Sequence, residues 1–235
     1  MKREKQSSII ELTGCTRGQI DALVKKFKLT RFRSRNNYTI NEDCLSLKNP
    51  ELWYFLGWFA SDGNIHNTNS GSEIIQFTLK DEEPLQHLKH ILSYTGDVKL
   101  YSKKGKTNFK YIENKEVIRD YYFLGITNKK LVTLIKEVFP NPYNKTKTLN
   151  FPNIPNEDCL RMFIRGFWDG DGCFSVCDSK FYLEAHCASK DFTEGFVNSL
   201  NNMNFKTYSY AREGCFDIRI SSTVAKDFCK WLYQK

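Results

Sequence analysis

Two segments of the sequence end an apolar run on an Asp-Gly pair. The first is LWYFLGWFASDGNI, which reaches Asp62 and Gly63, and the second is LRMFIRGFWDGDGCF, which reaches Asp171 and Gly172. A single pair of this kind is most often a turn that ends a helix. Because the pair recurs at the same place in a repeated unit, we expect the two carboxylates to lie together. Hard oxygen ligands favour Mg²⁺, so Asp62 and Asp171 are predicted metal ligands.

Each Asp-Gly pair follows a predicted helix. Asn49 is a suitable N-cap before Pro50 at the first helical position, and Asn156 begins the second copy. Both helices are apolar on most sides, so both should be buried. Each helix carries small residues four apart, Gly57 with Ser61 and Gly166 with Gly170, which would let the two backbones approach closely. The simplest arrangement packs the helices on each other, which places the two carboxylates side by side where the helix dipoles add negative potential.

The repeat continues beyond the two helices. IIQFTLKDEEPLQHLKHIL follows the first and EAHCASKDFTEGFVNSLNNM follows the second, and each reads as a strand, a Lys-Asp pair and an amphipathic helix. The lysines of these pairs, Lys80 and Lys190, lie at similar distances behind the two aspartates. Phosphodiester hydrolysis needs a positioned water and charge stabilisation on the phosphate, and divalent ions held by carboxylates supply both. We predict that Lys80 and Lys190 face phosphates and polarise or deprotonate water, with solvated surface lysines as the alternative and Gln76 as a weaker candidate.

Two later segments, YYFLGITNKKLVTLIKEVF and CFDIRISSTVAKDFCKWLY, again read as a strand followed by a helix. Each half is therefore predicted to run helix, two strands, helix, two strands, helix. The antiparallel hairpins are expected around 66–79, 97–126, 173–188 and 206–220.

The predicted fold class is α+β. It is a pseudo-twofold tandem repeat of αββαββα units, with two antiparallel four-stranded saddle sheets and the two Asp-Gly helices packed at the centre. The halves are predicted at 46–152 and 153–235. A small N-terminal helical domain and its linker are predicted at 1–45.

The net charge of +8 is concentrated at the N-terminus. Residues 1–40 hold ten Lys or Arg and three acids, which leaves 25 Lys or Arg against 24 acids in the remainder. The segment SSIIELTGCTRGQIDALVKKFKL has apolar residues at helical spacing on both sides of Gly14, which predicts a helix-turn-helix that binds DNA. A plain helical hairpin or a solvated tail is the alternative. The residues expected to contact DNA here are Arg17, Gln19, Lys25, Lys26, Arg31 and Arg33.

In the body of the chain, strands rather than helices are expected to contact DNA. Alternate side chains of an antiparallel sheet can face the major groove. The segment KLYSKKGKTNFKYIENK at 99–115 is predicted to be a hairpin that touches phosphates, with an ordinary solvated hairpin as the alternative. The lysines that would make these contacts are Lys99, Lys103, Lys104, Lys106 and Lys110.

The composition is that of a globular protein, with 40% hydrophobic and 26% charged residues. No apolar run reaches the roughly 18 residues that a membrane span needs. The start MKREKQSS leads into no signal-peptide core, so we expect a cytoplasmic location and no membrane partner. The eight cysteines contain no CxxC pair, which favours buried free thiols over a zinc site or disulfides.

The segments FLGWFASDG and FIRGFWDGDG resemble the two motifs of the LAGLIDADG homing endonuclease family, and the resemblance covers residues from about 50 to 235. The joining segment, NKTKTLNFPNIPNEDCLRMFIRGFWDGDGCFSV, is similar to that of members encoded in phage and organellar introns. The second motif follows the family pattern at Asp169 and Asp171. The first has Ala60 where an acid is often found, but it keeps Asp62, and the acid before the final glycine carries the chemistry in the family.

The resemblance implies a site-specific endonuclease that hydrolyses double-stranded DNA with Mg²⁺ (or Mn²⁺) held by Asp62 and Asp171. A monomer is expected, because one chain supplies both motifs. Ca²⁺ is expected to support binding with little cleavage, because its coordination positions water loosely. Two alternatives stay open on the same scaffold: a maturase that binds intron RNA, and a DNA-binding regulator that has lost catalysis. The paired acids argue against the regulator.

Overall fold

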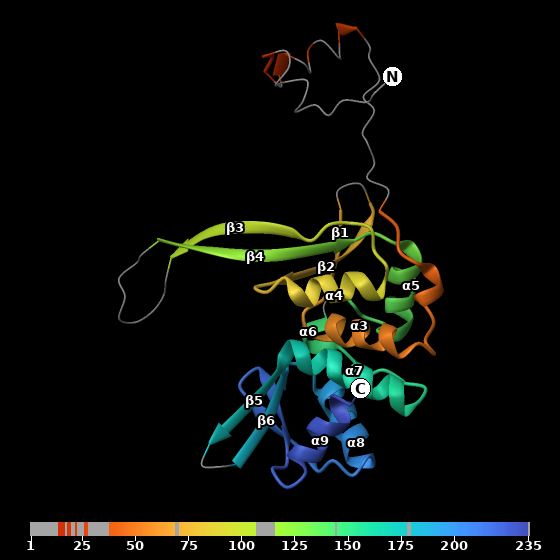
Figure 1. The fold of residues 1–235 in the computed structure, drawn as a ribbon, viewed down its shortest axis with the longest axis vertical. Helices are drawn as coiled ribbons and strands as arrows, with labels where there is room; N and C mark the ends of the chain where they lie inside the picture. The colour runs from red at the N-terminus through yellow and green to blue at the C-terminus, as the bar shows by residue number, and fades with distance from the viewer. Residues whose placement is uncertain are drawn as a thin grey trace. The chain divides into compact units, whose positions relative to one another are not determined.

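The structure is a computed structural model that describes residues 14–16, 18, 19, 22, 26, 27, 38–68, 71–106, 116–143, 145–177 and 180–234. The chain divides into two compact units, 1–37 and 38–235 (Figure 1). In the first unit, Gln19 N donates to the Thr16 hydroxyl at 3.4 Å, and Thr16 N donates to Gln19 Oε1 at 2.8 Å. This reciprocal cap precedes the helical residues Gly18 and Gln19. The rest of the predicted helix-turn-helix lies outside the described residues.

The second unit contains the predicted repeat. A 3-10 helix, η1 (Glu42–Cys44), precedes the first half, and α6 (Lys145–Thr148) lies in the linker between the halves. The first half comprises α3 (Pro50–Ser61), β1 (Asn64–Asn67), β2 (Glu73–Leu79), α4 (Glu83–Ile91), β3 (Lys99–Lys106), β4 (Glu116–Ile126) and α5 (Lys129–Val138). The second comprises α7 (Glu157–Asp171), β5 (Gly172–Cys177), β6 (Lys180–Cys187), α8 (Lys190–Asn202), β7 (Thr207–Arg212), β8 (Cys215–Ile220) and α9 (Ala225–Leu232). The predicted order of elements is confirmed in both halves. Among the described residues, no helix has the length and apolar character to cross a membrane.

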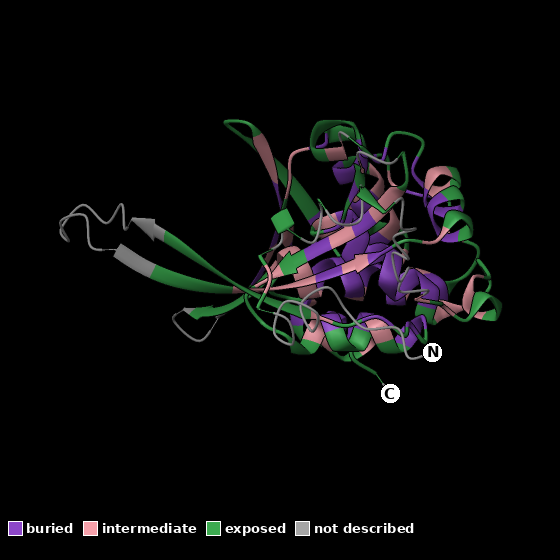
Figure 2. Cartoon of the chain, turned by 90° about the horizontal axis from the view of Figure 1, so that it is seen from above, coloured by how far each residue is buried: buried purple, intermediate pink, exposed green. Residues whose placement is uncertain are grey.

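Each half contains one four-stranded antiparallel sheet. The strand orders are β1-β2-β4-β3 and β5-β6-β8-β7, so the two halves share one topology. In the first sheet Ile75 and Phe77 are buried beside Leu124 and Ile126, while the residues between them face away from the helices. Each sheet therefore has one face packed on helices and one face that no helix of the described residues covers. Figure 2 shows the buried residues gathered in the body and the exposed residues along the projecting hairpins.

Side-chain caps begin the two central helices, as predicted. Asn49 Oδ1 accepts from Glu51 N at 3.1 Å at the start of α3, and Asn156 Oδ1 accepts from Cys159 N at 3.0 Å at the start of α7. Every residue of α3 from Leu52 to Ala60 is buried. A surface helix would bury only one stripe, so this pattern shows that α3 lies inside the molecule.

The backbones of α3 and α7 touch at glycine positions. A Cβ atom on Gly57 would lie 2.2 Å from Phe163 O, and one on Gly166 would lie 2.1 Å from Tyr54 O. Any larger residue would require the helices to move apart. The close approach predicted from these two glycines is therefore confirmed.

We predict that Gly57→Ala lowers the free energy of unfolding by more than about 3 kcal/mol, the upper end of ordinary overpacking, because the added methyl group meets backbone that cannot yield. Gly71→Ala is the matched control. Gly71 has a φ of +79° and nothing within 4 Å of its Cβ position, so only about 1–2 kcal/mol of left-handed strain is expected. Urea denaturation of the variants measures both losses. Equal losses would show that the helix contact is softer than the geometry indicates.

Candidate active site at the ends of the central helices

The structure brings Asp62 and Asp171 together. Asp62 caps the C-terminal end of α3, and Asp171 is the last residue of α7. A Cβ atom on Gly170 would lie 2.8 Å from Asp62 Oδ2, so the Asp62 carboxylate rests against the residue that precedes Asp171. Both carboxylates also lie where the carbonyl ends of helices add negative potential.

Lys145 supplies a positive charge at this point, and it is not among the residues predicted from the sequence. Its Nζ donates hydrogen bonds to Ala60 O and Ser61 O, both at 2.7 Å. These carbonyls belong to the last turn of α3, where backbone oxygens lack helical partners. Lys145 begins α6 and is far from both aspartates in the sequence. Nothing in its polar surroundings, NKTKT, distinguishes it from an ordinary surface lysine.

The three charged groups perturb one another. Burial, followed by the charge of Asp62, raises the pKa of Asp171 to about 6, although Lys145 and His186 act in the opposite direction. Burial also raises the pKa of Asp62. Burial lowers the pKa of Lys145 to about 8, and the Asp171 and Asp62 carboxylates offset only part of that effect. Two ionised carboxylates and one ammonium leave a net negative charge in a partly desolvated place.

A cavity of about 110 Å³ opens beside Asp171. Its lining includes Ser61, Lys145, His186 and Cys187. Burial raises the pKa of the Cys187 thiol, so this sulfur stays neutral near pH 7 and does not compete with the carboxylates as an anionic ligand. The polar lining gives room for ordered water next to the carboxylate.

The donor set at the helix ends fits a hard cation. Among the described residues, no group of three or more His, Cys, Asp and Glu side chains is placed to hold a metal ion. Asp62 and Asp171 by themselves would leave most of a coordination shell to water and substrate oxygens, which is the arrangement that Mg²⁺ favours. The residual negative charge at the site gives such an ion a favourable place.

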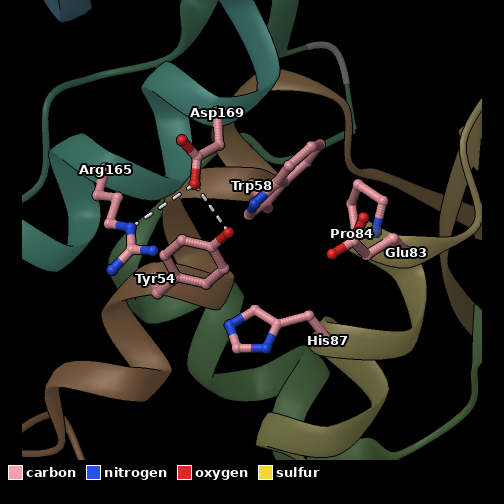
Figure 3. Close-up of a pocket in the computed structure, with 7 residues that line it drawn as sticks. All are labelled: Tyr54, Trp58, Glu83, Pro84, His87, Arg165 and Asp169. Carbon is pink, nitrogen blue, oxygen red and sulfur yellow. Dashed lines mark hydrogen bonds and ion pairs between the residues drawn. The ribbon is translucent and has the colours of Figure 1, made fainter. Parts of the chain in front are cut away.

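Asp169, the other acid of the second segment, has a structural role. Its carboxylate accepts hydrogen bonds from the Tyr54 hydroxyl at 2.9 Å and the Tyr233 hydroxyl at 2.6 Å, and it pairs with Arg165 at 3.8 Å. Figure 3 shows Asp169 with Tyr54 and Arg165 in a separate and larger pocket, of about 430 Å³, lined by residues of α3, α4 and α7. Because three side chains already hold this carboxylate, Asp169 is not free to join the other two aspartates.

No ion pair in the described part of the chain joins Lys80 or Lys190 to Asp62 or Asp171. Lys80 is exposed directly after β2. Lys190 is exposed at the start of α8, where its Nζ lies 3.6 Å from Glu194. Gln76 lies opposite Asn64 in β1, two residues beyond Asp62. The catalytic roles of Lys80 and Lys190 stay predictions.

Two of the hairpin lysines lie on the uncovered face of the first sheet. Lys99 is opposite Phe123 and Lys103 is opposite Arg119, and these positions alternate with those that face the helices. Lys104, opposite Ile118, occupies the alternate set of strand positions, and Lys106 lies opposite Glu116. In the first unit, Gln19 serves in the helix cap and Lys26 Nζ lies 5.6 Å from the centre of the Phe27 ring. Outside the described residues are Arg17, Lys25, Arg31, Arg33 and Lys110.

A family model described as the LAGLIDADG-like domain matches residues 49–132 and 158–231. Among curated proteins, the chain is 26% identical over 146 residues to glutamine–fructose-6-phosphate aminotransferase (isomerizing) and 25% identical over 182 residues to replication factor C small subunit, both from Methanocaldococcus jannaschii. These matches cover 60% and 69% of this chain but only 12% and 9% of the two relatives. The chain thus spans about a tenth of the length of the curated relatives it matches.

Three solved structures share the fold at low identity. I-DmoI in complex with DNA and Mn gives a TM-score of 0.54 at 17% identity, covering 81% of this chain and 99% of that one. The homing endonuclease I-WcaI, bound to its DNA recognition sequence, gives 0.59 at 15% identity, covering 94% and 90%. The N-terminal LAGLIDADG domain of DUF199/WhiA gives 0.52 at 13% identity, covering 81% and 83%. Since the family model matches more than half of the chain, in two copies that coincide with the two halves of the fold, this protein belongs to the LAGLIDADG-like domain family.

Proposed function

We propose that this protein is a site-specific double-strand DNA endonuclease that hydrolyses phosphodiester bonds with divalent metal ions. The observation that carries the proposal is the pairing of Asp62 and Asp171 at abutting helix ends, with the Lys145 ammonium beside them. A carboxylate whose pKa is raised to about 6 is costly to keep ionised at neutral pH, and such groups concentrate at functional sites. Solved structures of I-DmoI contain DNA with Mn, and one of its variants was solved with target DNA in the presence of Mg.

The chemistry assigns a role to each group. Asp62 and Asp171 would hold the ions, with Mg²⁺ or Mn²⁺ as cofactor and Ca²⁺ supporting binding with little cleavage. A divalent ion bound there supplies charge stabilisation on the phosphate and a water of lowered pKa. Lys145, whose pKa is about 8, is suited to stabilise negative charge on the phosphate or to move a proton near neutral pH. Lys80 and Lys190 are proposed as further phosphate-facing groups.

The uncovered faces of the two sheets are the proposed DNA-binding surface. A strand rises about 3.3 Å per residue, close to the 3.4 Å spacing of base pairs along one strand of DNA, so strands can follow a groove. Lys99 and Lys103 would contact phosphates. One chain carries both aspartates, so a monomer suffices. Residues 1–45 are proposed to extend the contact at one end of the target, and the reaction is proposed to occur in the cytoplasm.

The alternatives are a maturase that binds intron RNA and a DNA-binding regulator, and the fold alone does not separate them from a nuclease. The paired carboxylates do discriminate, because a protein that only binds nucleic acid gains nothing from two partly desolvated carboxylates that repel phosphates. Incubation with a plasmid library and Mg²⁺, followed by sequencing of the cut ends, tests the proposal. Recurrent cuts at one sequence would support it, and binding without any cut in Mg²⁺ or Mn²⁺ would contradict it.

Replacing Asp62→Asn or Asp171→Asn should abolish cleavage and spare DNA binding, because a ligand charge is lost while the fold is kept. The loss should exceed the roughly 10- to 100-fold cost of removing an outer-shell partner. Asp169→Asn, two residues before Asp171, is the matched control: it should cut DNA while melting at a lower temperature. Wild-type cutting by either active-site variant would refute the assignment.

Lys145→Met is expected to slow cleavage by about 10²- to 10⁴-fold, the contribution of one positioned acid–base group, without weakening DNA binding. Lys80→Met and Lys190→Met serve as comparisons, since both side chains are exposed and neither pairs with an active-site carboxylate. Single-turnover rates and thermal unfolding separate the possible roles of Lys145. A lower melting temperature with an unchanged rate would make Lys145 a structural anchor only.

The raised pKa of Asp171 predicts a specific pH dependence of stability. The folded state holds the Asp171 proton up to about pH 6, whereas an unfolded aspartate releases it near 3.9, so the folded state binds more protons between these values. Stability is therefore lost as pH rises from about 4 to about 6. Asp171→Asn lacks this loss and should be the more stable protein above pH 6.

Thermal unfolding of both proteins across this window, without divalent ions, measures the difference. Added Mg²⁺ should then raise the melting temperature of the wild type and leave that of Asp171→Asn unchanged, because a ligand stabilises only a fold that binds it. Identical pH profiles for the two proteins would contradict the assignment of the carboxylate.

A further inference from the structure

A network of ion pairs lies on the uncovered face of the second sheet. Asp217 of β8 is only 1% exposed, yet it is not among the residues that face the helices, because its neighbours Ile218 and Ile220 occupy that face. Its Oδ2 pairs with Arg212 Nε at 2.5 Å and with an Arg219 Nη at 3.7 Å. Its Oδ1 lies 2.9 Å from His186 Nδ1. We call Asp217, Arg212, Arg219, His186 and Glu184 the Asp217 cluster.

The strand register assembles this cluster from three strands. His186 in β6 lies opposite Asp217, and Glu184 lies opposite Arg219. Arg219 Nε is 2.9 Å from Glu184 Oε1, and its guanidinium stands over the Tyr210 ring at 5.2 Å from the centroid. Arg219 is therefore held on two sides, by a carboxylate and by an aromatic face.

Asp217 is buried beside Arg212, Arg219 and His186, which all contact its carboxylate. A carboxylate this inaccessible is strongly unfavourable unless its charge is paired, and the two arginines supply that pairing. The arginines keep outward access, since the Arg212 and Arg219 side chains are 57% and 41% exposed. Each guanidinium is thus fixed on its inner side and open on its outer side.

We propose that Asp217 is a positioning residue that presents Arg212 and Arg219 to guanines in the DNA major groove, so that the second half determines sequence specificity. The proposal rests on the DNA-binding function proposed above. A guanidinium fork matches the O6 and N7 acceptors of guanine, and an arginine fixed beforehand loses less freedom on binding. The deep, narrow major groove of an RNA helix would not admit the same side chains, so duplex DNA is the ligand this arrangement fits.

The first sheet presents a different surface at its corresponding face. Lys99, Lys103 and Arg119 lie there, and within the described residues no acidic side chain pairs with any of them. A lysine is a point charge on a flexible stem and lacks the planar fork of arginine. The two sheets therefore present different groups: the second carries two arginines held by a buried carboxylate, and the first carries lysines together with Arg119.

Selection of bound sequences from a randomised DNA duplex library, in Ca²⁺ so that binding is measured without cleavage, tests the inference. The full-length wild type should prefer guanine at two positions on the second-half side of the site. Arg212→Lys and Arg219→Lys should each relax one of these positions by about tenfold or more, which is within the discrimination of one bidentate contact. Their affinity for random-sequence duplex should stay within about twofold, because the charge is kept.

Asp217→Asn should relax both positions at once while binding random-sequence duplex at least as tightly as the wild type, because a negative charge is removed from the surface. A purely structural role would instead weaken all binding together. Arg161→Lys is the matched control, because Arg161 lies on α7, away from the sheet, and should change no preference. Melting temperatures identify any variant that fails to fold. If Asp217→Asn does not fold, the two Arg→Lys variants still test whether the arginines read guanine.

Unchanged guanine preferences in both Arg→Lys variants would overturn the inference. Preferences retained in a folded Asp217→Asn would overturn the positioning role of Asp217. If the wild type selects no sequence at all, the proposed function itself fails, and that result is distinguishable because it is seen before any substitution is made.

Discussion

The contact between α3 and α7 is the constraint on which the rest of the structure depends. Gly57 and Gly166 each meet backbone of the opposite helix, so no side chain separates the two. The helix ends, and with them Asp62 and Asp171, then have one relative position. Because α4 packs on α3 while α9 and the strands β5 and β6 pack on α7, the same contact also sets the separation of the two sheets. Close-packed interiors of this kind deform little, so site and sheets share one rigid frame.

This frame holds the Asp62 and Asp171 carboxylates close together although they repel each other. The linker between the halves offsets part of that repulsion. Lys145 ties the linker to the last carbonyls of α3. The same linker is joined to the second half, because Ser189 donates its hydroxyl proton to Leu149 O at 2.5 Å and the Phe151 ring packs on Phe163. The linker thus does more than connect two domains. It contacts both and supplies the Lys145 ammonium, which partly neutralises the aspartates.

Local chemistry explains how much of this could be predicted. The helix starts follow from Asn49 and Asn156, and the order of elements follows from a hydrophobic periodicity written twice, so the fold could be derived without long-range information. The position of Lys145 at the site could not be predicted, because its partners are backbone carbonyls that are distant in the sequence. The alternation in CFDIRI places Asp217 on an outer face, but its neighbours come from β6 and β7, and only the register of the sheet brings them together. The structural role of Asp169 could not be predicted either, because Tyr54, Arg165 and Tyr233, which hold its carboxylate, come together only in the folded chain.

The two sheets differ in length although their topology is the same. In the first half β3 has 8 residues and β4 has 11, whereas β7 and β8 have 6 each. At about 3.3 Å per residue, the longer hairpin extends the first half several base-pair steps farther from the helix ends than the second. A rod-shaped ligand lying along both sheets would thus be contacted unequally, over a longer stretch on the first-half side of the aspartates than on the second-half side. A pseudosymmetric molecule of this shape would therefore distinguish the two directions of a bound duplex by the unequal lengths of its sheets alone.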